Sequence, residues 1–246
     1  MLLPVVQPPF SNLGKRLESM LRKAIYDYNL LENTQHLGIA LSGGKDSLTL
    51  LYLLCAIRGN GFENFEITAF HVSGEFSCGS SVQIPSILQI CKTLNVNLKI
   101  LEQKQTLEKL SCYPCSRERR RLIFNAAKEE GIKTIAFGHH RDDSIQTLLM
   151  NLLHKGEFAS NLAKVEMIRY GITIIRPLIF ISEKDILNFS TAGGFNRVVC
   201  KCPIGQNSMR KKTDLLLNYI EKTFPEARSN LASASRLYGS DKANKI

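Results

Sequence analysis

The chain has 246 residues, of which 44% are hydrophobic and 22% charged, and these ordinary globular values predict a folded protein with a real core. No apolar run reaches the roughly 18 residues that a membrane-spanning helix needs. The first twelve residues hold three prolines and no basic stretch, which does not fit a signal peptide. We therefore expect a cytoplasmic protein without membrane contact. The net charge of +10 favours a polyanionic partner such as nucleic acid.

Hydrophobic periodicity predicts strands and helices that alternate along the first two thirds of the chain. Asn12 is the expected cap of a first helix that runs to about Tyr28. The predicted strands span 37–41, 67–72, 96–101 and 134–137, and the predicted helices lie around 48–54, 82–94, 122–127 and 142–153. This alternation is typical of an α/β fold with a doubly wound, mostly parallel sheet.

The pattern changes after Gly156. We predict a hairpin over 163–176 that turns at Tyr170-Gly171, a short helix over 183–189, a cysteine-bearing segment over 198–206 and a helix around 215–220. The last residues are polar and are expected to fray. The sequence thus predicts an N-terminal helical segment (1–30), one α/β domain (31–228) and a polar C-terminal tail (229–246).

A glycine-rich loop follows the first predicted strand and precedes a buried helix. Its residues are Ser42, Gly43, Gly44, Lys45, Asp46 and Ser47. A strand–glycine loop–helix unit aims backbone N–H groups and the positive helix end at one point, which suits a phosphate. The loop is not a Walker A motif, because Asp46 follows Lys45 and Ile39 stands where that motif needs glycine. A carboxylate in such a loop points to Mg²⁺ coordination or to helix capping.

A second polar loop follows the fourth predicted strand, with the residues Gly138, His139, His140, Arg141, Asp142 and Asp143. Ligands of α/β sheets bind outside the carboxyl ends of the strands, so both loops should share one edge. Asp142 and Asp143 are candidate Mg²⁺ ligands, and the two histidines can orient phosphate or transfer a proton. Acidic residues also stabilise a first helical turn by themselves, so a purely structural role stays open.

Seven cysteines are present, and four of them form two close pairs, Cys112/Cys115 and Cys200/Cys202. Of the three isolated ones, Cys55 and Cys91 fit apolar helical patterns and are expected to be core thiols, while Cys78 stands alone. The pairs could form a structural zinc site, or three of the four could hold an iron–sulfur cluster.

Four arginines follow the first cysteine pair, at Arg117, Arg119, Arg120 and Arg121. We expect them in the first turn of a helix, where cations oppose the helix dipole. That placement favours a grip on RNA phosphates, although a solvated basic face remains the alternative.

These motifs carry a resemblance to a known family. The loop Ser42–Ser47 resembles the SGGxDS signature of the PP-loop ATP pyrophosphatase superfamily. The chain also resembles the tRNA 2-thiocytidine synthetase family over nearly its whole length. The motifs that carry this resemblance are GHHRDD, CxxCSRxRR, Arg176-Pro177-Leu178 with Glu183, and a late cysteine. Asn151 matches the family pattern. Gln146 departs from it, because glutamate is common there, and the CNLCG string of many bacterial members is absent around Cys200.

The resemblance implies a set of site residues. ATP would bind Ser42–Ser47 with Gly138 and His139, and Mg²⁺ would bind Asp46 and Asp143. A 4Fe–4S cluster would bind Cys112, Cys115 and Cys202, with Cys200 as the other choice for the third ligand. Catalytic roles would fall to Asp46, Cys112, Cys115 and Asp143, and RNA contact to the four arginines.

The resemblance also implies the reaction and its partners. The expected enzyme is an ATP-dependent tRNA sulfurtransferase. It adenylates the C2 oxygen of a cytidine at tRNA position 32, in the anticodon loop, and sulfur then replaces that oxygen. The expected partners are tRNA and a cysteine desulfurase as sulfur donor, and a homodimer is left open. The sequence keeps three alternatives: a tRNA lysidine synthetase, thiolation of a tRNA uridine, and a zinc-stapled RNA-binding protein without enzymatic activity.

Overall fold

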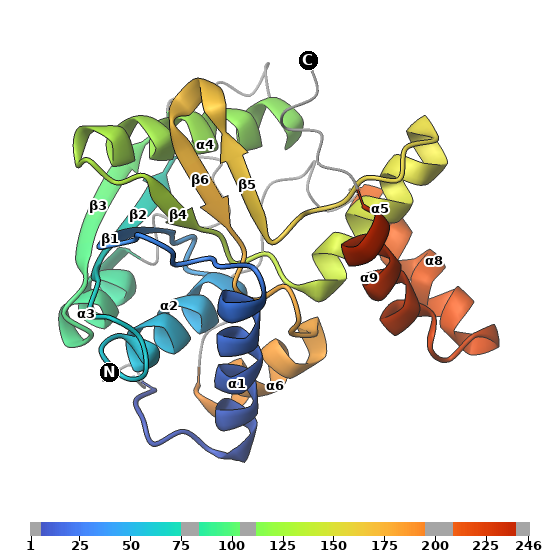
Figure 1. The fold of residues 1–246 in the computed structure, drawn as a ribbon, viewed down its shortest axis with the longest axis horizontal. Coiled ribbons are helices and arrows are strands. Elements are labelled where there is room, and N and C mark those ends of the chain that lie inside the picture. The colour runs from blue at the N-terminus through green and yellow to red at the C-terminus, as the bar shows by residue number, and fades with distance from the viewer. Residues whose placement is uncertain (1–5, 75–83, 104–111, 195–208, 240–246) are drawn as a thin grey trace.

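A six-stranded sheet in the order β3-β2-β1-β4-β6-β5 forms the centre of the fold (Figure 1). The computed structural model describes residues 6–74, 84–103, 112–194 and 209–239. Its strands are β1 (His36–Ala40), β2 (Glu66–Ser73), β3 (Asn97–Glu102), β4 (Thr134–Ala136), β5 (Lys164–Met167) and β6 (Ile172–Ile175). The pairs β1–β2, β1–β4, β2–β3 and β4–β6 are parallel, and β5–β6 is antiparallel. The predicted doubly wound, mostly parallel sheet is therefore confirmed.

The helices are α1 (Asn12–Asp27), α2 (Lys45–Ile57), α3 (Ile84–Thr93), α4 (Cys112–Glu129), α5 (Arg141–Lys155), α6 (Glu183–Ala192), α8 (Met209–Thr223) and α9 (Ala227–Tyr238). Ser11, rather than the predicted Asn12, caps α1, because its hydroxyl accepts the N–H of Gly14. The predicted hairpin turn contains a short 3₁₀ segment, η3 (Ile168–Tyr170), and ends at Gly171, whose φ of +62° suits glycine. Among the described helices, none combines the length and the apolar character that a bilayer crossing needs.

Two apolar layers cover the two faces of the sheet. Strand β2 shows the division, because Ile67 and Ala69 pack with α1, α2, α3 and α6, whereas Phe70 and Val72 pack with α4. In Figure 1, α4 lies on one side of the sheet and α1, α2, α3 and α6 lie on the other. Cys91 is buried in the first layer and Cys55 packs against it, so the predicted core thiols are confirmed. Burial raises the pKa of Cys55 to about 11 and that of Cys91 to about 12.

Helices α8 and α9 pack against α5, beside the sheet rather than on it (Figure 1). Their shared apolar cluster contains Ile145 and Leu149 of α5, Leu217 of α8 and Ala232 of α9. The expected fraying of the tail from residue 229 is wrong for residues 229–238. These residues continue α9, and the sequence-based prediction missed the small side chains, Ala232 and Ser235, that α9 buries.

An arginine on α9 joins the three helices. Arg228 lies 3.0 Å from Asp142 at the start of α5, and 3.0 Å and 2.7 Å from Asp214 and Glu221 of α8. Only 14% of its side chain is exposed, and 7% of that of Asp142. Burial lowers the pKa of Arg228, but the three carboxylates raise it by more. The guanidinium is thus a buried charge that three acidic groups neutralise.

We predict that Arg228→Ala lowers the free energy of unfolding by about 3 kcal/mol, because it leaves the buried Asp142 carboxylate without its closer cation and only Arg141, 3.8 Å away, remains. The matched control is Arg16→Ala. Arg16 also pairs with an aspartate, Asp185, but 58% of its side chain is exposed, so its loss should cost about 0–1 kcal/mol. Urea denaturation measures both. Equal losses in the two variants would contradict a buried anchor at Arg228.

Candidate active site

The glycine-rich loop connects β1 to α2 and presents backbone N–H groups. Gly43 has a φ of +79°, a conformation that side chains other than glycine rarely adopt. Gly44 is the N-cap of α2 and offers no side chain to its first-turn amides. The hydroxyls of Ser42 and Ser47 lie 3.1 Å apart, and Ser47 also donates to the carbonyl of Gly44 at 3.0 Å. Uncapped amides at a positive helix end, with two hydroxyls beside them, fit a phosphate group.

The second polar loop touches the first. A Cβ atom at Gly138 would lie 3.1 Å from the backbone of both Asp46 and Ser47, so glycine allows the two loops to meet. Strands β1 and β4 are parallel neighbours, which places both loops at their carboxyl ends. The predicted sharing of one sheet edge follows directly from this register.

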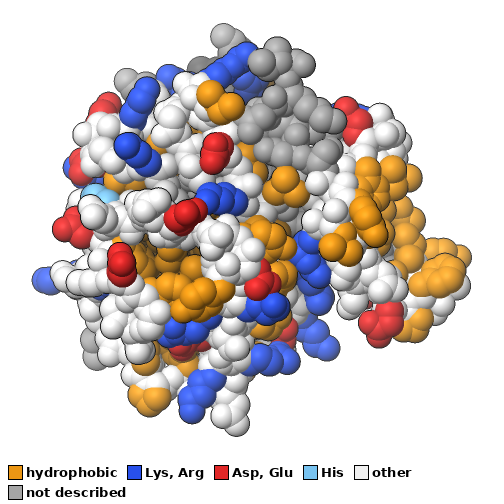
Figure 2. Space-filling model, in the orientation of Figure 1, with side chains coloured by type: hydrophobic (Ala, Val, Ile, Leu, Met, Phe, Trp, Pro, Cys, Tyr) orange, Lys and Arg blue, Asp and Glu red, His pale blue; other side chains and the backbone are white. Residues whose placement is uncertain are grey.

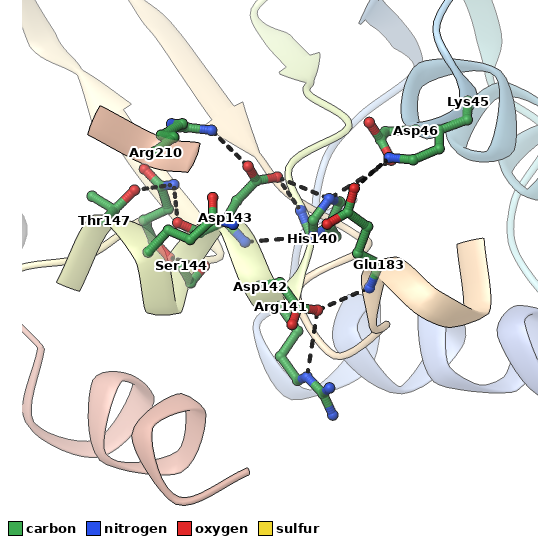
Figure 3. A network of polar contacts seen from close by, with 12 residues as sticks. Lys45, Asp46, His140, Arg141, Asp142, Asp143, Ser144, Thr147, Glu183 and Arg210 are labelled. Atoms are coloured by element: carbon green, nitrogen blue, oxygen red, sulfur yellow. Dashed lines mark hydrogen bonds and ion pairs between the residues drawn. The ribbon is translucent and has the colours of Figure 1, made fainter. Parts of the chain in front are cut away.

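Lys45 lies between two carboxylates. Its ammonium is 2.7 Å from Asp46 and 3.0 Å from Glu183, the first residue of α6 (Figure 3). Burial lowers the pKa of Lys45, but Asp46 and Glu183 raise it by more. The sequence noted Glu183 only as part of a family pattern and did not place it at the site. The structure adds Glu183 as a third charged group beside the glycine-rich loop Ser42–Ser47, which is called the nucleotide loop below.

His140 lies between the two predicted magnesium ligands. Its Nε2 is 3.7 Å from Asp46 and 3.4 Å from Asp143 (Figure 3). His140 and Asp143 also form a reciprocal cap, in which each side chain accepts the backbone N–H of the other residue. Arg210 of α8 lies 2.6 Å from the other oxygen of Asp143. Arg210 had no role in the sequence-based prediction, and only the fold brings it here.

The charges around Asp143 control its protonation. Burial raises the pKa of Asp143, but His140, His139 and Arg210 outweigh burial and lower it to about 2. Asp143 is therefore a carboxylate at neutral pH, the form that Mg²⁺ requires. Its neighbour Asp142 is different, because one oxygen accepts the N–H of Glu183 at 2.8 Å and the other binds Arg228. Asp142 therefore has the purely structural role that the sequence left open for Asp142 and Asp143.

His139 stacks on Phe137, with ring centroids 5.8 Å apart. Its Nδ1 atom is buried without a hydrogen-bond partner among the described residues. Burial and the cation of Arg176 lower the pKa of His139 to about 3. The ring is therefore neutral at pH 7, with one buried nitrogen left for a further partner.

The first cysteine pair begins helix α4, whereas the sequence placed it before a helix. Cys112 is the first residue of α4, and Cys115 follows three residues later in the same helix. The side-chain amide of Gln103 donates to the carbonyl of Cys115 at 3.3 Å and lies 4.0 Å from its sulfur. Gln103 directly follows β3, and its N–H bonds Ser73 at the end of β2. Cys115 therefore lies at the carboxyl edge of the sheet, the edge that carries the nucleotide loop.

The earlier start of α4 corrects the position of the four arginines. They occupy the second and third turns of α4 rather than its first turn, so the expected conflict with the helix dipole is largely absent. Arg121 forms two hydrogen bonds with Glu118, at 2.8 and 2.6 Å, and Arg120 bonds the carbonyl and hydroxyl of Ser116 at 3.3 Å. The alternative of a solvated basic face is thereby strengthened for Arg121.

Some predicted residues lie outside the described part of the chain, namely Cys78, Cys200, Cys202 and the segment 198–206, as does the side chain of Cys112. Among the described residues, no group of three or more His, Cys, Asp or Glu is arranged to hold a metal ion. Mg²⁺ usually takes one or two protein carboxylates and completes its shell with phosphate oxygens and water. Asp46 and Asp143, on either side of His140, fit that incomplete kind of site.

Two residues of the family pattern have structural contacts. Gln146 donates its amide to Asp214 at 3.4 Å, so glutamate at this position would place two like charges together. Asn151 donates to the carbonyl of Ala159 at 2.8 Å and fixes the chain after α5. Glutamine in place of the family's glutamate at position 146 therefore suits its partner on α8, Asp214.

A family model described as a PP-loop domain matches residues 12–198. The chain belongs to the PP-loop domain family. The predicted superfamily is thus confirmed, and the residues that carry the signature are those that form the nucleotide loop.

Curated PP-loop relatives are similar over most of their length. The tRNA-cytidine(32) 2-sulfurtransferase of Legionella pneumophila (strain Paris) is 35% identical, over 91% of this chain and 81% of the relative. That of Xylella fastidiosa (strain M12) is 33% identical, over 90% and 76%. Among solved structures, the U34-tRNA thiolase NcsA from Methanococcus maripaludis, with its 4Fe–4S cluster, matches with a TM-score of 0.73 and 23% identity, over 90% of this chain and 77% of NcsA. The relatives confirm the resemblance to the tRNA 2-thiocytidine synthetase family, and the solved structure confirms the fold.

His139 predicts how stability depends on pH. A histidine with a pKa near 6.5 in the unfolded chain and about 3 in the folded chain binds its proton first in the unfolded state. Stability is therefore complete above pH 6.5 and falls as the pH drops toward 3. We expect a loss of about 1–2 kcal/mol between pH 7 and pH 5, measured by urea denaturation at both values. His139→Gln should remove this part of the loss, and an unchanged pH dependence in that variant would exclude His139 as its source.

Proposed function

We propose that this chain is an ATP-dependent tRNA sulfurtransferase that converts cytidine 32 of tRNA into 2-thiocytidine. The observation that carries the proposal is the contact between Gln103 and Cys115, because it places a thiol of the CxxC pair at the sheet edge that holds the nucleotide loop. The similar proteins of Legionella pneumophila and Xylella fastidiosa are named for this reaction.

The nucleotide loop would bind ATP through its phosphates. In the proposed reaction, AMP is transferred to the C2 oxygen of cytidine and pyrophosphate leaves. Ser42, Gly43, Gly44 and Ser47 would bind the pyrophosphate part through N–H groups and hydroxyls, and Lys45 would neutralise its charge. Gly138 allows the second loop to approach, and the free ring nitrogen of His139 offers a further polar contact. Asp46 and Asp143 would hold Mg²⁺, which neutralises phosphate charge during the transfer.

The thiols of Cys112 and Cys115 would hold a 4Fe–4S cluster, together with Cys202 or Cys200. When bound, the cluster supplies an open iron that can carry the incoming sulfur. Two thiols one helical turn apart fit such a group, and the Gln103 amide near the sulfur of Cys115 is a hydrogen-bond donor that suits a thiolate. The cytidine must leave its stack to reach this edge, at a cost of a few kcal/mol that is smaller in a loop than in a duplex.

Other parts of the proposal concern partners. A cysteine desulfurase would supply the sulfur, in the cytoplasm. A homodimer is consistent with apolar side chains on α8 and beyond, where Leu215, Tyr219 and Phe224 are 70%, 69% and 65% exposed. Figure 2 shows hydrophobic side chains gathered over the C-terminal helices. Sedimentation of the purified protein tests the dimer.

We predict that Cys115→Ala abolishes thiolation while ATP binding persists, because the cysteine belongs to the sulfur-transfer site and not to the nucleotide loop. The test uses anaerobically purified protein, with iron content, visible absorption, ATP affinity and mass spectrometry of the tRNA as readouts. Cys55→Ala, a cysteine in the apolar layer around α2, is the matched control and should keep iron and activity.

Each alternative has its own outcome in this experiment. Full activity of Cys115→Ala would remove the CxxC pair from the reaction. Zinc in place of iron, without activity, would support the RNA-binding protein. A thiolated uridine would move the reaction to another base, and a lysidine product would identify the ligase.

We also predict that replacing Arg119 and Arg120 together with glutamine weakens tRNA binding and lowers its salt dependence, since arginine contacts to phosphate release counterions. Arg121→Gln is the control. The Arg121 guanidinium makes two hydrogen bonds with a carboxylate, that of Glu118, and this variant removes one charge instead of two, so it should have the smaller effect. Filter binding over a series of salt concentrations measures the slope. Equal slopes in the wild type and the double variant would leave these arginines as a solvated face.

A further inference from the structure

A second pocket lies on the other side of α5 from the nucleotide loop. It has a volume of about 230 Å³ and is lined from five parts of the chain: the end of α1, the start of α5, the segment around the start of β5, Ile179 between β6 and α6, and α9 with its end. Figure 2 shows blue side chains gathered where the C-terminal helices meet the rest of the molecule. None of the residues predicted to bind ATP or a cluster lines this pocket.

The lining of the pocket is positively charged. Arg141, Lys164 and Arg236 contribute three cations, and among the described residues that line the pocket none is acidic. Two carboxylates approach from outside the lining. Asp142 lies 3.8 Å from Arg141, and Glu32, which is 59% exposed, lies 3.5 Å from Lys164.

Neither carboxylate fully neutralises its neighbour. Asp142 is already held by Arg228 and by the N–H of Glu183, and the exposed Glu32 is screened by solvent. The described polar contact of Arg236 is a neutral one, the hydroxyl of Ser233, and its guanidinium lies over the ring of Phe180. Positive charge therefore exceeds negative charge around this cavity.

Neutral polar groups complete the lining. Tyr28 contributes a phenol. The hydroxyls of Ser144 and Ser235 also lie in the lining, but Ser144 donates to the carbonyl of Asn161 and Ser235 shares a hydrogen bond with Ser160. Burial raises the pKa of Tyr28, although Arg236 lowers it, and the net shift is upward. The phenol therefore stays protonated and can donate a hydrogen bond to an anion. Three cations and the phenol of Tyr28 around a small cavity match the needs of a phosphate group.

The wall of this pocket is bonded to the turn of α5 that carries Asp143. Asn161 donates to the carbonyl of Asp143 at 3.4 Å and to the hydroxyl of Thr147 at 3.1 Å, and the hydroxyl of Ser144 donates to the carbonyl of Asn161 at 3.2 Å. Asp143 faces the nucleotide loop, while Arg141 and Ser144, on the same turn, face the pocket. The pocket and the proposed Mg²⁺ ligand Asp143 thus share the same turn of α5.

We propose that this pocket is a phosphate subsite that takes a backbone phosphate of the tRNA, on the side of α5 opposite to the nucleotide loop. The inference rests on the proposed function, because it names how the tRNA of that reaction is held. The ligand would be one backbone phosphate, which carries a single negative charge and would lie among Arg141, Lys164 and Arg236.

The test removes two of the cations by Lys164→Gln and Arg236→Gln in the full-length protein. Loss of one phosphate contact should weaken tRNA binding roughly eightfold in 0.1 M salt and lower the salt slope by about 1, because one phosphate contributes about −0.9 to that slope. Mg·ATP affinity should stay unchanged. The matched control is Lys99→Gln. Lys99 lies on β3, the other edge strand, and pairs with Glu130 at 2.7 Å much as Lys164 pairs with Glu32.

Two further arms make each outcome decisive. Lys164→Glu alone keeps the Arg236–Phe180 contact and should weaken tRNA binding more than Lys164→Gln does. Thermal shifts with inorganic phosphate, measured with saturating Mg·ATP so that the loop Ser42–Ser47 is filled, test a free anion as the occupant of the pocket. Binding of tRNA that is unchanged in the double variant, or reduced equally by Lys99→Gln, would overturn the subsite. Loss of only the phosphate-induced shift in the double variant would assign the pocket to a free anion and overturn the tRNA assignment. A wild-type protein that binds tRNA without thiolating it would instead remove the proposed function and leave the subsite standing.

Discussion

The arrangement of the site depends on one buried carboxylate, that of Asp142. Its two oxygens bind groups from two different parts of the chain, the N–H of Glu183 at the start of α6 and the guanidinium of Arg228 on α9. Each contact satisfies a charge that would be costly to leave unpaired at this depth. Together they fix the first turn of α5 against α6, and so they set where His140 and Asp143 lie relative to the nucleotide loop.

The charges that face the loop are already paired before any ligand is present. Lys45 contacts Asp46 and Glu183, and Asp143 contacts Arg210. Such pairing lets five charged groups stand close together without a large desolvation cost. In the proposed reaction, phosphate and Mg²⁺ would exchange with these partners, so binding replaces ion pairs instead of burying new unpaired charge. Arg210 is the group whose position this exchange would change most directly, because it shares the carboxylate assigned to Mg²⁺.

Local patterns in the sequence were enough to predict the sheet, both polar loops and their common edge. The hydrophobic periods of residues 37–41 and 134–137 predicted two strands of one parallel sheet, and parallel strands end on the same side. That these two strands are neighbours is a finding of the structure. The contacts of Arg210 and Arg228 could not be predicted in this way, because 67 and 86 residues separate them from their aspartates. The start of α4 was placed too late, after the CxxC pair, although a proline such as Pro114 is tolerated in a first turn. Helix α9 was not predicted, because its residues are mostly polar and the ones that it buries, such as Ala232 and Ser235, are small.

The proposed RNA contacts lie toward opposite edges of the sheet. Helix α4, with its arginines, packs on β2, and Cys115 lies beside the end of β3, whereas the basic pocket is lined by the start of β5. Strands β1 and β4, whose loops form the nucleotide site, lie between these edges in the strand order. A tRNA loop held on both sides would therefore pass over the nucleotide loop. The base presented there would be the one whose flanking phosphates match the distance between the arginines of α4 and the basic pocket. Selection of the base would then come from where the backbone is held, since phosphate contacts fix the register of a nucleic acid without reading its sequence.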